Sequence, residues 1–108
     1  MNSNRVLVHA SDMLKYDLVK ILLEDGRTDP VRDNCYPLRT SSQQNDIPLT
    51  TLILKDKRVQ DNIEHALSVC GKFNRYGKRE IIKQVYKQVI VDELKIVIEQ
   101  LKEIVDKL

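Results

Sequence analysis

The side chains best suited to catalysis or metal binding are few and widely spaced in this sequence. The histidines are His9 and His65, and the cysteines are Cys35 and Cys70. A nucleophile needs a base within hydrogen-bond reach, and no motif around these residues provides such a pair. Their spacing matches no zinc-binding pattern, and three scattered glycines form no phosphate-binding loop. We therefore predict no catalytic site, no metal site and no cofactor.

Positive charge is concentrated in one segment, although the whole chain has a formal net charge of only +2. Residues 55–91 contain nine Lys or Arg against four Asp or Glu. Cations near aromatic rings, here Phe73, Tyr76 and Tyr86, can hold phosphates and stack on bases. Accessory nucleic-acid binding is therefore the alternative function, while a solvated loop or an acidic protein partner also fits. The candidate patch is Lys72, Arg75, Lys78, Arg79, Lys83 and Lys87.

The elements that would carry these residues repeat along the chain. The string LVHASDMLKYDLVKILLEDGR, residues 7–27, aligns without a gap with LRTSSQQNDIPLTTLILKDKR, residues 38–58. The two strings are 31 residues apart, and matches such as Leu18 with Leu49 fall on apolar positions. A weaker third copy with a longer loop follows. Such a repeat predicts one structural unit used several times.

Each copy has the pattern of two helices joined by a turn. We expect helices over about residues 4–13 and 16–24 in the first copy, with Gly26 in a left-handed conformation after the second helix. In the second copy, Pro37 opens one helix and Pro48 begins the next. Neighbouring hairpins should bury Leu18, Leu22, Leu49 and Ile53 between them.

The first copy resembles an ankyrin repeat. DLVKILLEDG matches the second helix and turn of that repeat, and Pro37-Leu38 matches the Pro-Leu pair that opens the next one. The resemblance covers residues 4–60 well and 61–90 poorly. Leu14 and Asn45 stand where the family usually has glycine, and the Thr-Pro-Leu-His motif is incomplete. The sequence is similar to the divergent ankyrin proteins abundant in large DNA viruses of protists. This resemblance would imply a viral protein in the host cytoplasm.

The resemblance implies an all-α solenoid of helical hairpins that binds another, unidentified protein without catalysis. We expect a single domain over 1–108, with repeat 1 at 4–34, repeat 2 at 35–60 and a divergent repeat 3 at 61–90. Transfer of the family's finger and first-helix positions places partner contacts at His9, Asp12, Arg32, Asp33, Asn34, Arg39 and Gln43.

Residues 79–108 lack glycine and proline and carry apolar residues at a helical period. A break near Ile90–Asp92 would start an extra amphipathic helix over 91–108. Its apolar stripe suits either a cap on the open end of the stack or a homodimer through residues 90–108. No segment is long enough to span a bilayer, and two cysteines without a disulfide pattern favour free thiols in a reducing, cytoplasmic compartment.

Overall fold

The computed structural model describes residues 3–72 and 78–108, and within these ranges every regular element is an α-helix. The helices are α1 (Ser3–Asp12), α2 (Tyr16–Asp25), α3 (Arg32–Gln43), α4 (Ile47–Leu54), α5 (Lys57–Gln60), α6 (Ile63–Lys72) and α7 (Arg79–Asp106). The expected all-α class is confirmed.

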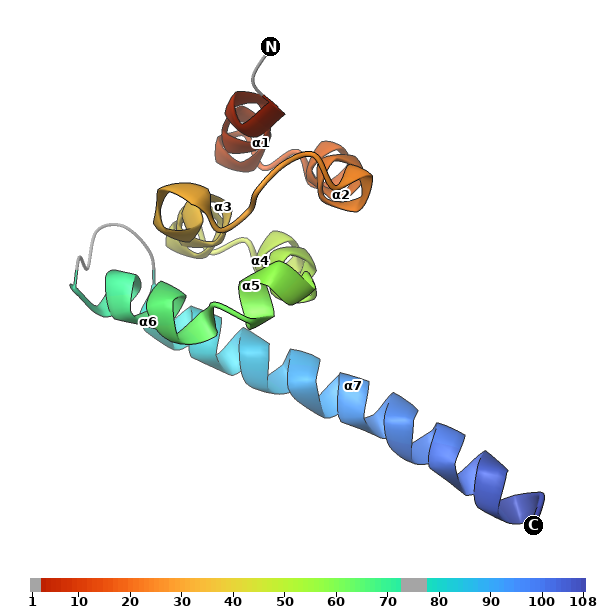
Figure 1. Ribbon diagram of the computed structural model, residues 1–108. Helices are drawn as coiled ribbons and strands as arrows, with labels where there is room; N and C mark the ends of the chain where they lie inside the picture. Colours follow the sequence, from red (N-terminus) through yellow and green to blue (C-terminus); the bar gives the residue numbers. More distant parts are fainter. Residues whose placement is uncertain (1–2, 73–77) are drawn as a thin grey trace.

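The helices are arranged as three successive pairs (Figure 1). Helices α1 and α2 contact each other, as do α3 and α4, and α6 and the start of α7. Between pairs, α3 lies against both α1 and α6, while α4 lies against both α2 and α7. The middle pair is therefore covered on two sides, whereas the first pair is covered on one side by the described part of the chain.

The turns of the first two hairpins share their backbone conformation. Leu14 has φ of 54° and Asn45, 31 residues later, has φ of 59°. The amide of Lys15 donates to the carbonyl of Ala10 at 2.9 Å, and the matching amide of Asp46 donates to Ser41 at 3.0 Å. A residue in the left-handed conformation thus closes each turn, and the sequence alignment pairs these two residues with each other. Gly26 also has positive φ, 82°, as expected.

The core is aliphatic and runs through the contacts between pairs. Leu49 and Ile53 are fully buried, as predicted, and Pro48 lies in the first turn of α4. The prediction is wrong for Leu18, which is 41% exposed, while Leu22 is half-buried. Helix α2 instead buries Val19 and Leu23, because the described residues place a neighbouring pair of helices on one side of it.

The start of α3 departs from a regular helix. Asp33, Asn34 and Cys35 all have φ near 57° and ψ near 47°, so the right-handed part of α3 begins only at Tyr36, next to the expected Pro37. The guanidinium of Arg39 donates to the carbonyl oxygens of Asn34 at 2.9 Å and Asp33 at 2.8 Å. A left-handed turn of non-glycine residues is costly, and these two hydrogen bonds stabilise it.

Helix α7 is continuous from Arg79 to Asp106, without the predicted break near Ile90–Asp92. Its first half buries Ile82, Val85 and Val89 against the other helices. Every residue from 91 to 108 is exposed, and this half extends beyond the rest of the molecule (Figure 1). The expected cap over 91–108 is therefore wrong: among the described residues, the buried side chains of α7 all lie in its first half, and residues 91–108 are exposed.

Candidate protein-binding surface

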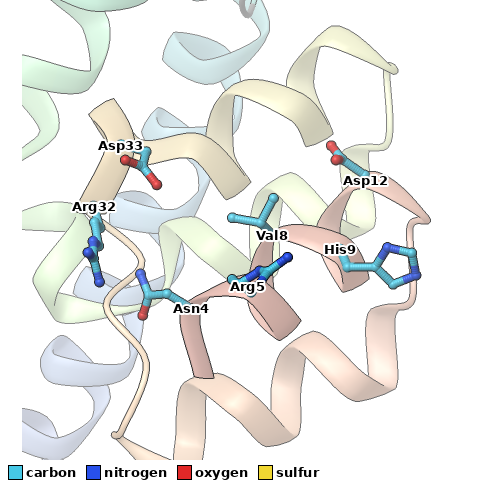
Figure 2. Close-up of a pocket in the computed structure, with 7 residues that line it drawn as sticks. All are labelled: Asn4, Arg5, Val8, His9, Asp12, Arg32 and Asp33. Atoms are coloured by element: carbon cyan, nitrogen blue, oxygen red, sulfur yellow. The ribbon is translucent and has the colours of Figure 1, made fainter. Parts of the chain in front are cut away.

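Four of the predicted contact residues line one open groove of about 360 Å³ between α1 and the start of α3. These are His9 and Asp12 on α1 and Arg32 and Asp33 on α3, all of them exposed (Figure 2). The sequence analysis missed three further lining residues on α1, which are Asn4, Arg5 and Val8. Arg5 and Val8 lie four residues before the predicted His9 and Asp12 on the same helix, and this spacing was the signal that could have found them. Asn4 lies four residues before Val8 and so extends the same face.

Asn4 fixes one end of this groove. Its side-chain amide donates to the carbonyl of Asp29 at 3.0 Å, and the amide of Asp29 donates back to Asn4 Oδ1 at 2.8 Å. Asp29 Oδ1 in turn accepts from the amide of Val31 at 3.0 Å. The loop before α3 is thereby attached to the first turn of α1, which positions Arg32 and Asp33 beside Arg5.

Asp12 holds the two helices together, a role that sequence reasoning did not anticipate. Its Oδ1 accepts hydrogen bonds from the hydroxyls of Tyr36 at 2.8 Å and Thr40 at 2.9 Å. Its backbone carbonyl accepts from the amide of Gln44 at 3.2 Å. Partial burial and this contact with Asp12 raise the pKa of Tyr36. Asp12, predicted only as a partner contact, therefore also has a structural role.

The remaining predicted residues lie outside the groove. Arg39 stabilises the left-handed turn and stacks over the Tyr36 ring, with 5.3 Å from its guanidinium carbon to the ring centroid. Asn34 Oδ1 is 3.2 Å from His65 Nε2 and so links α3 to α6. Gln43 is exposed near the end of α3. Arg39 and Asn34 thus have structural roles in addition to any contact with a partner.

An apolar hollow of about 590 Å³ adjoins the polar groove and shares His9 with it. Met13, Leu14, Tyr16 and Leu18 line it where α1 turns into α2. Met13 is 56% exposed, a large fraction for a long apolar side chain. Exposed apolar surface beside polar groups is typical of places where one protein binds another.

The basic residues are only partly gathered into one surface. Arg79, Lys83 and Lys87 are spaced four residues apart and so follow one face of α7. Glu80 lies 3.9 Å from Lys83, and the Lys78 ammonium donates to Asn45 Oδ1 at 2.8 Å. Arg75 and the side chain of Lys72 lie outside the described residues. The described patch is therefore a short stripe of three cations with an acidic neighbour.

The two cysteines are poor candidates for chemistry. Both are free and buried, as the sequence predicts for their pairing state. Burial, followed by the neighbouring Cys70, raises the pKa of the Cys35 thiol to about 11, and burial also raises the pKa of Cys70. Since the thiolate is the reactive form, neither thiol is an activated nucleophile near neutral pH.

The described residues contain no cluster of three or more His, Cys, Asp or Glu side chains with the arrangement of a metal site. Within ranges 3–72 and 78–108, none of the helices combines the length and apolar content that crossing a bilayer requires.

Comparison of the chain with protein-family models, with curated proteins and with solved structures finds no match.

Proposed function

We propose that this chain is a noncatalytic protein–protein interaction module built from ankyrin-like helical hairpins. The matching turns at Leu14 and Asn45 and the side-by-side order of α1, α3 and α6 support a solenoid of repeated hairpins. In such a stack, neighbouring units share one core, and their outer surfaces are left for a partner. The resemblance to viral ankyrin proteins, together with the two free cysteines, supports a viral protein in the host-cell cytoplasm.

The observation that carries this proposal is the pairing of a polar groove with an apolar hollow. Protein interfaces place a desolvated apolar anchor beside polar groups that fix orientation. Here Met13 and Leu18 provide the apolar surface, and Arg5, His9 and Arg32 provide the polar rim. The partner is therefore a protein segment that inserts an apolar side chain beside a carboxylate or amide.

The proposal is tested by affinity capture from a nuclease-treated cell extract, using the wild-type chain and groove variants. His9→Ala combined with Arg32→Ala should reduce capture of the same partner, and Leu18→Asp should abolish it. Each variant should keep the wild-type helical circular dichroism, because these side chains are exposed. The melting temperature should stay the same for His9→Ala with Arg32→Ala and fall slightly for Leu18→Asp, since Leu18 is partly buried. Lys95→Ala, an exposed change on α7, serves as the matched control and should capture normally.

Capture that survives both groove variants would refute this surface.

A second candidate, nucleic-acid binding, is favoured by the stripe Arg79, Lys83 and Lys87 on one face of α7. Nucleic-acid binding would be recognised by an affinity for DNA or RNA that falls steeply with salt concentration. The combined substitution Arg79→Glu, Lys83→Glu and Lys87→Glu should then abolish this affinity.

A further inference from the structure

The exposed half of α7 carries an apolar stripe that the other described residues leave uncovered. Leu94, Val97, Leu101 and Ile104 are each about half exposed, at 54%, 48%, 55% and 57%. Val91, Ile98 and Val105 broaden the stripe on one side. An apolar patch of this extent, bordered by charged residues, marks an interaction surface.

This stripe is separate from the face that α7 buries in its first half. At about 100° of rotation per residue, its centre is turned by roughly 140° from the face of Ile82, Val85 and Val89. The second half therefore cannot cover the core by continuing the first. The cations Arg79, Lys83 and Lys87 share the direction of the stripe instead, so the whole outward face of α7 is available.

We propose that a second copy of this chain binds the stripe, with the two α7 helices antiparallel. Leu94, Leu101 and Leu108 alternate with Ile90, Val97 and Ile104 at spacings of three and four, the seam of a helix pair. In the antiparallel register, Leu94 packs beside Ile104 of the second copy, and Val97 beside its Leu101. This twofold arrangement uses the same surface on both chains, as an isologous dimer requires.

Charges on the edges of the stripe fit this register. On one edge, Glu93 faces Lys107 of the second copy, and Gln100 faces its own counterpart. On the other edge, Val91 faces Val105, and Ile98 faces Ile98. Glu93 Oε1 is held by the amide of Gln60 at 2.9 Å, so the carboxylate is positioned near the seam. A parallel register would instead place Glu93 against Ile98 and bring the two hairpin stacks to the same end.

The composition of this half argues for a protein rather than a lipid occupant. Residues 92–108 carry three Lys against five Asp or Glu, whereas helices that lie on membranes have a polar face rich in Lys and Arg. An antiparallel pair would separate the anchored first halves of the two α7 helices by roughly 40 Å along the pair, at the helix rise of about 1.5 Å per residue. The groove would then be presented twice, which increases avidity for a repeated partner.

Sedimentation equilibrium of the intact chain tests this proposal. The wild type should form a dimer, or a tetramer of two such pairs. Leu101→Glu should raise the dissociation constant by about a hundredfold or more, because it buries a charge in the seam. Ile96→Glu is the matched control. The exposed fraction of Ile96, 57%, is close to the 55% of Leu101, but Ile96 lies on the opposite side of the helix. This variant should associate normally, and both variants should keep their helical circular dichroism.

Orientation is tested by oxidative cross-linking and by charge exchange. Gln100→Cys should form an intermolecular disulfide, Leu94→Cys should not, and the wild type with its buried thiols should stay uncross-linked. Glu93→Lys should weaken the dimer, and adding Lys107→Glu should restore it. A monomer at every concentration would overturn the proposal, including a monomer that binds phosphatidylcholine vesicles. Cross-linking through Leu94→Cys alone would overturn the antiparallel register.

Discussion

In the second hairpin, Leu49 and Ile53 are fully buried, whereas the matching Leu18 of the first hairpin is 41% exposed and Leu22 is half-buried. The sequence pattern at these positions is the same, and so is the turn that precedes each helix. What differs is the surroundings, because α4 lies between α2 and α7 while α2 has one neighbouring pair. Burial in a stack of hairpins is therefore decided by position in the stack as much as by residue type.

A second motif shows the same contrast. Asp25 and Arg27 form an exposed ion pair at 2.6 Å, with 80% of the Arg27 side chain accessible. The matching Asp56 and Arg58 pair at 2.7 Å, and Arg58 also donates to the carbonyl oxygens of Thr28 at 2.6 Å and Leu23 at 3.2 Å. In the described part of the chain, the first pair links two residues of the same turn, whereas the second joins the two hairpins.

The largest expected effect comes from truncating the buried position. Ile53→Ala should lower the free energy of unfolding by about 2–5 kcal/mol, because it removes transfer energy and leaves a cavity. Leu18→Ala should lower it by less than about 1 kcal/mol, since much of that side chain is already in water. Urea unfolding followed by circular dichroism measures both values.

If Ile53→Ala does not fold, Ile53→Val provides a milder probe, with an expected loss of about 0.5–1.5 kcal/mol. Equal losses at Leu18 and Ile53 would show that the first hairpin is covered in solution as well as the second. Self-association that covers α2 would then be the first explanation to examine by sedimentation.

The two ion pairs provide a smaller effect of the same kind. Arg58→Ala should lower the free energy of unfolding by about 1–3 kcal/mol, because it removes the donor to two backbone carbonyls and the ion pair with Asp56. Arg27→Ala should change it by less than about 0.5 kcal/mol, as expected for an exposed ion pair. The same urea titration decides the matter, and similar losses at both positions would remove the proposed link between hairpins.

Much of the fold could be predicted from local signals in the sequence. Helical periodicity and Gly26 placed the first two helices to within one residue at each end, and Pro48 placed the start of α4. The β-branched run at residues 89–91 favours a break, yet the helix continues, because the buried Ile82, Val85 and Val89 anchor it and its weak local preference is outweighed. Which face of α7 meets the body depends on distant residues, so it could not be predicted locally.

The candidate site was predictable in part for a similar reason. Transfer of family positions found His9 and Arg32, which do share a groove. It could not reveal that Asp12 bridges α1 and α3, since its partners Tyr36 and Thr40 are more than twenty residues away. Met13 and Tyr16 were missed because large apolar or aromatic side chains are usually part of the core. Only the three-dimensional arrangement shows that the described residues leave them exposed.

The smallest expected effect concerns what the two hairpins share, which is the left-handed residue in each turn. A Cβ atom is disfavoured at positive φ, so Leu14→Gly should be more stable than Leu14→Ala by about 1 kcal/mol. Both variants lose the same contacts beyond Cβ, and the difference therefore isolates the backbone. At Asn45, the glycine variant should likewise be more stable than the alanine variant. At Lys20, an exposed position inside α2, alanine should instead be more stable than glycine by about 0.5–1 kcal/mol. Thermal unfolding of these three pairs checks the sign at each position. A sign at Leu14 that matches Lys20 would mean that the first turn is not left-handed, and the structural equivalence of the two hairpins would fail.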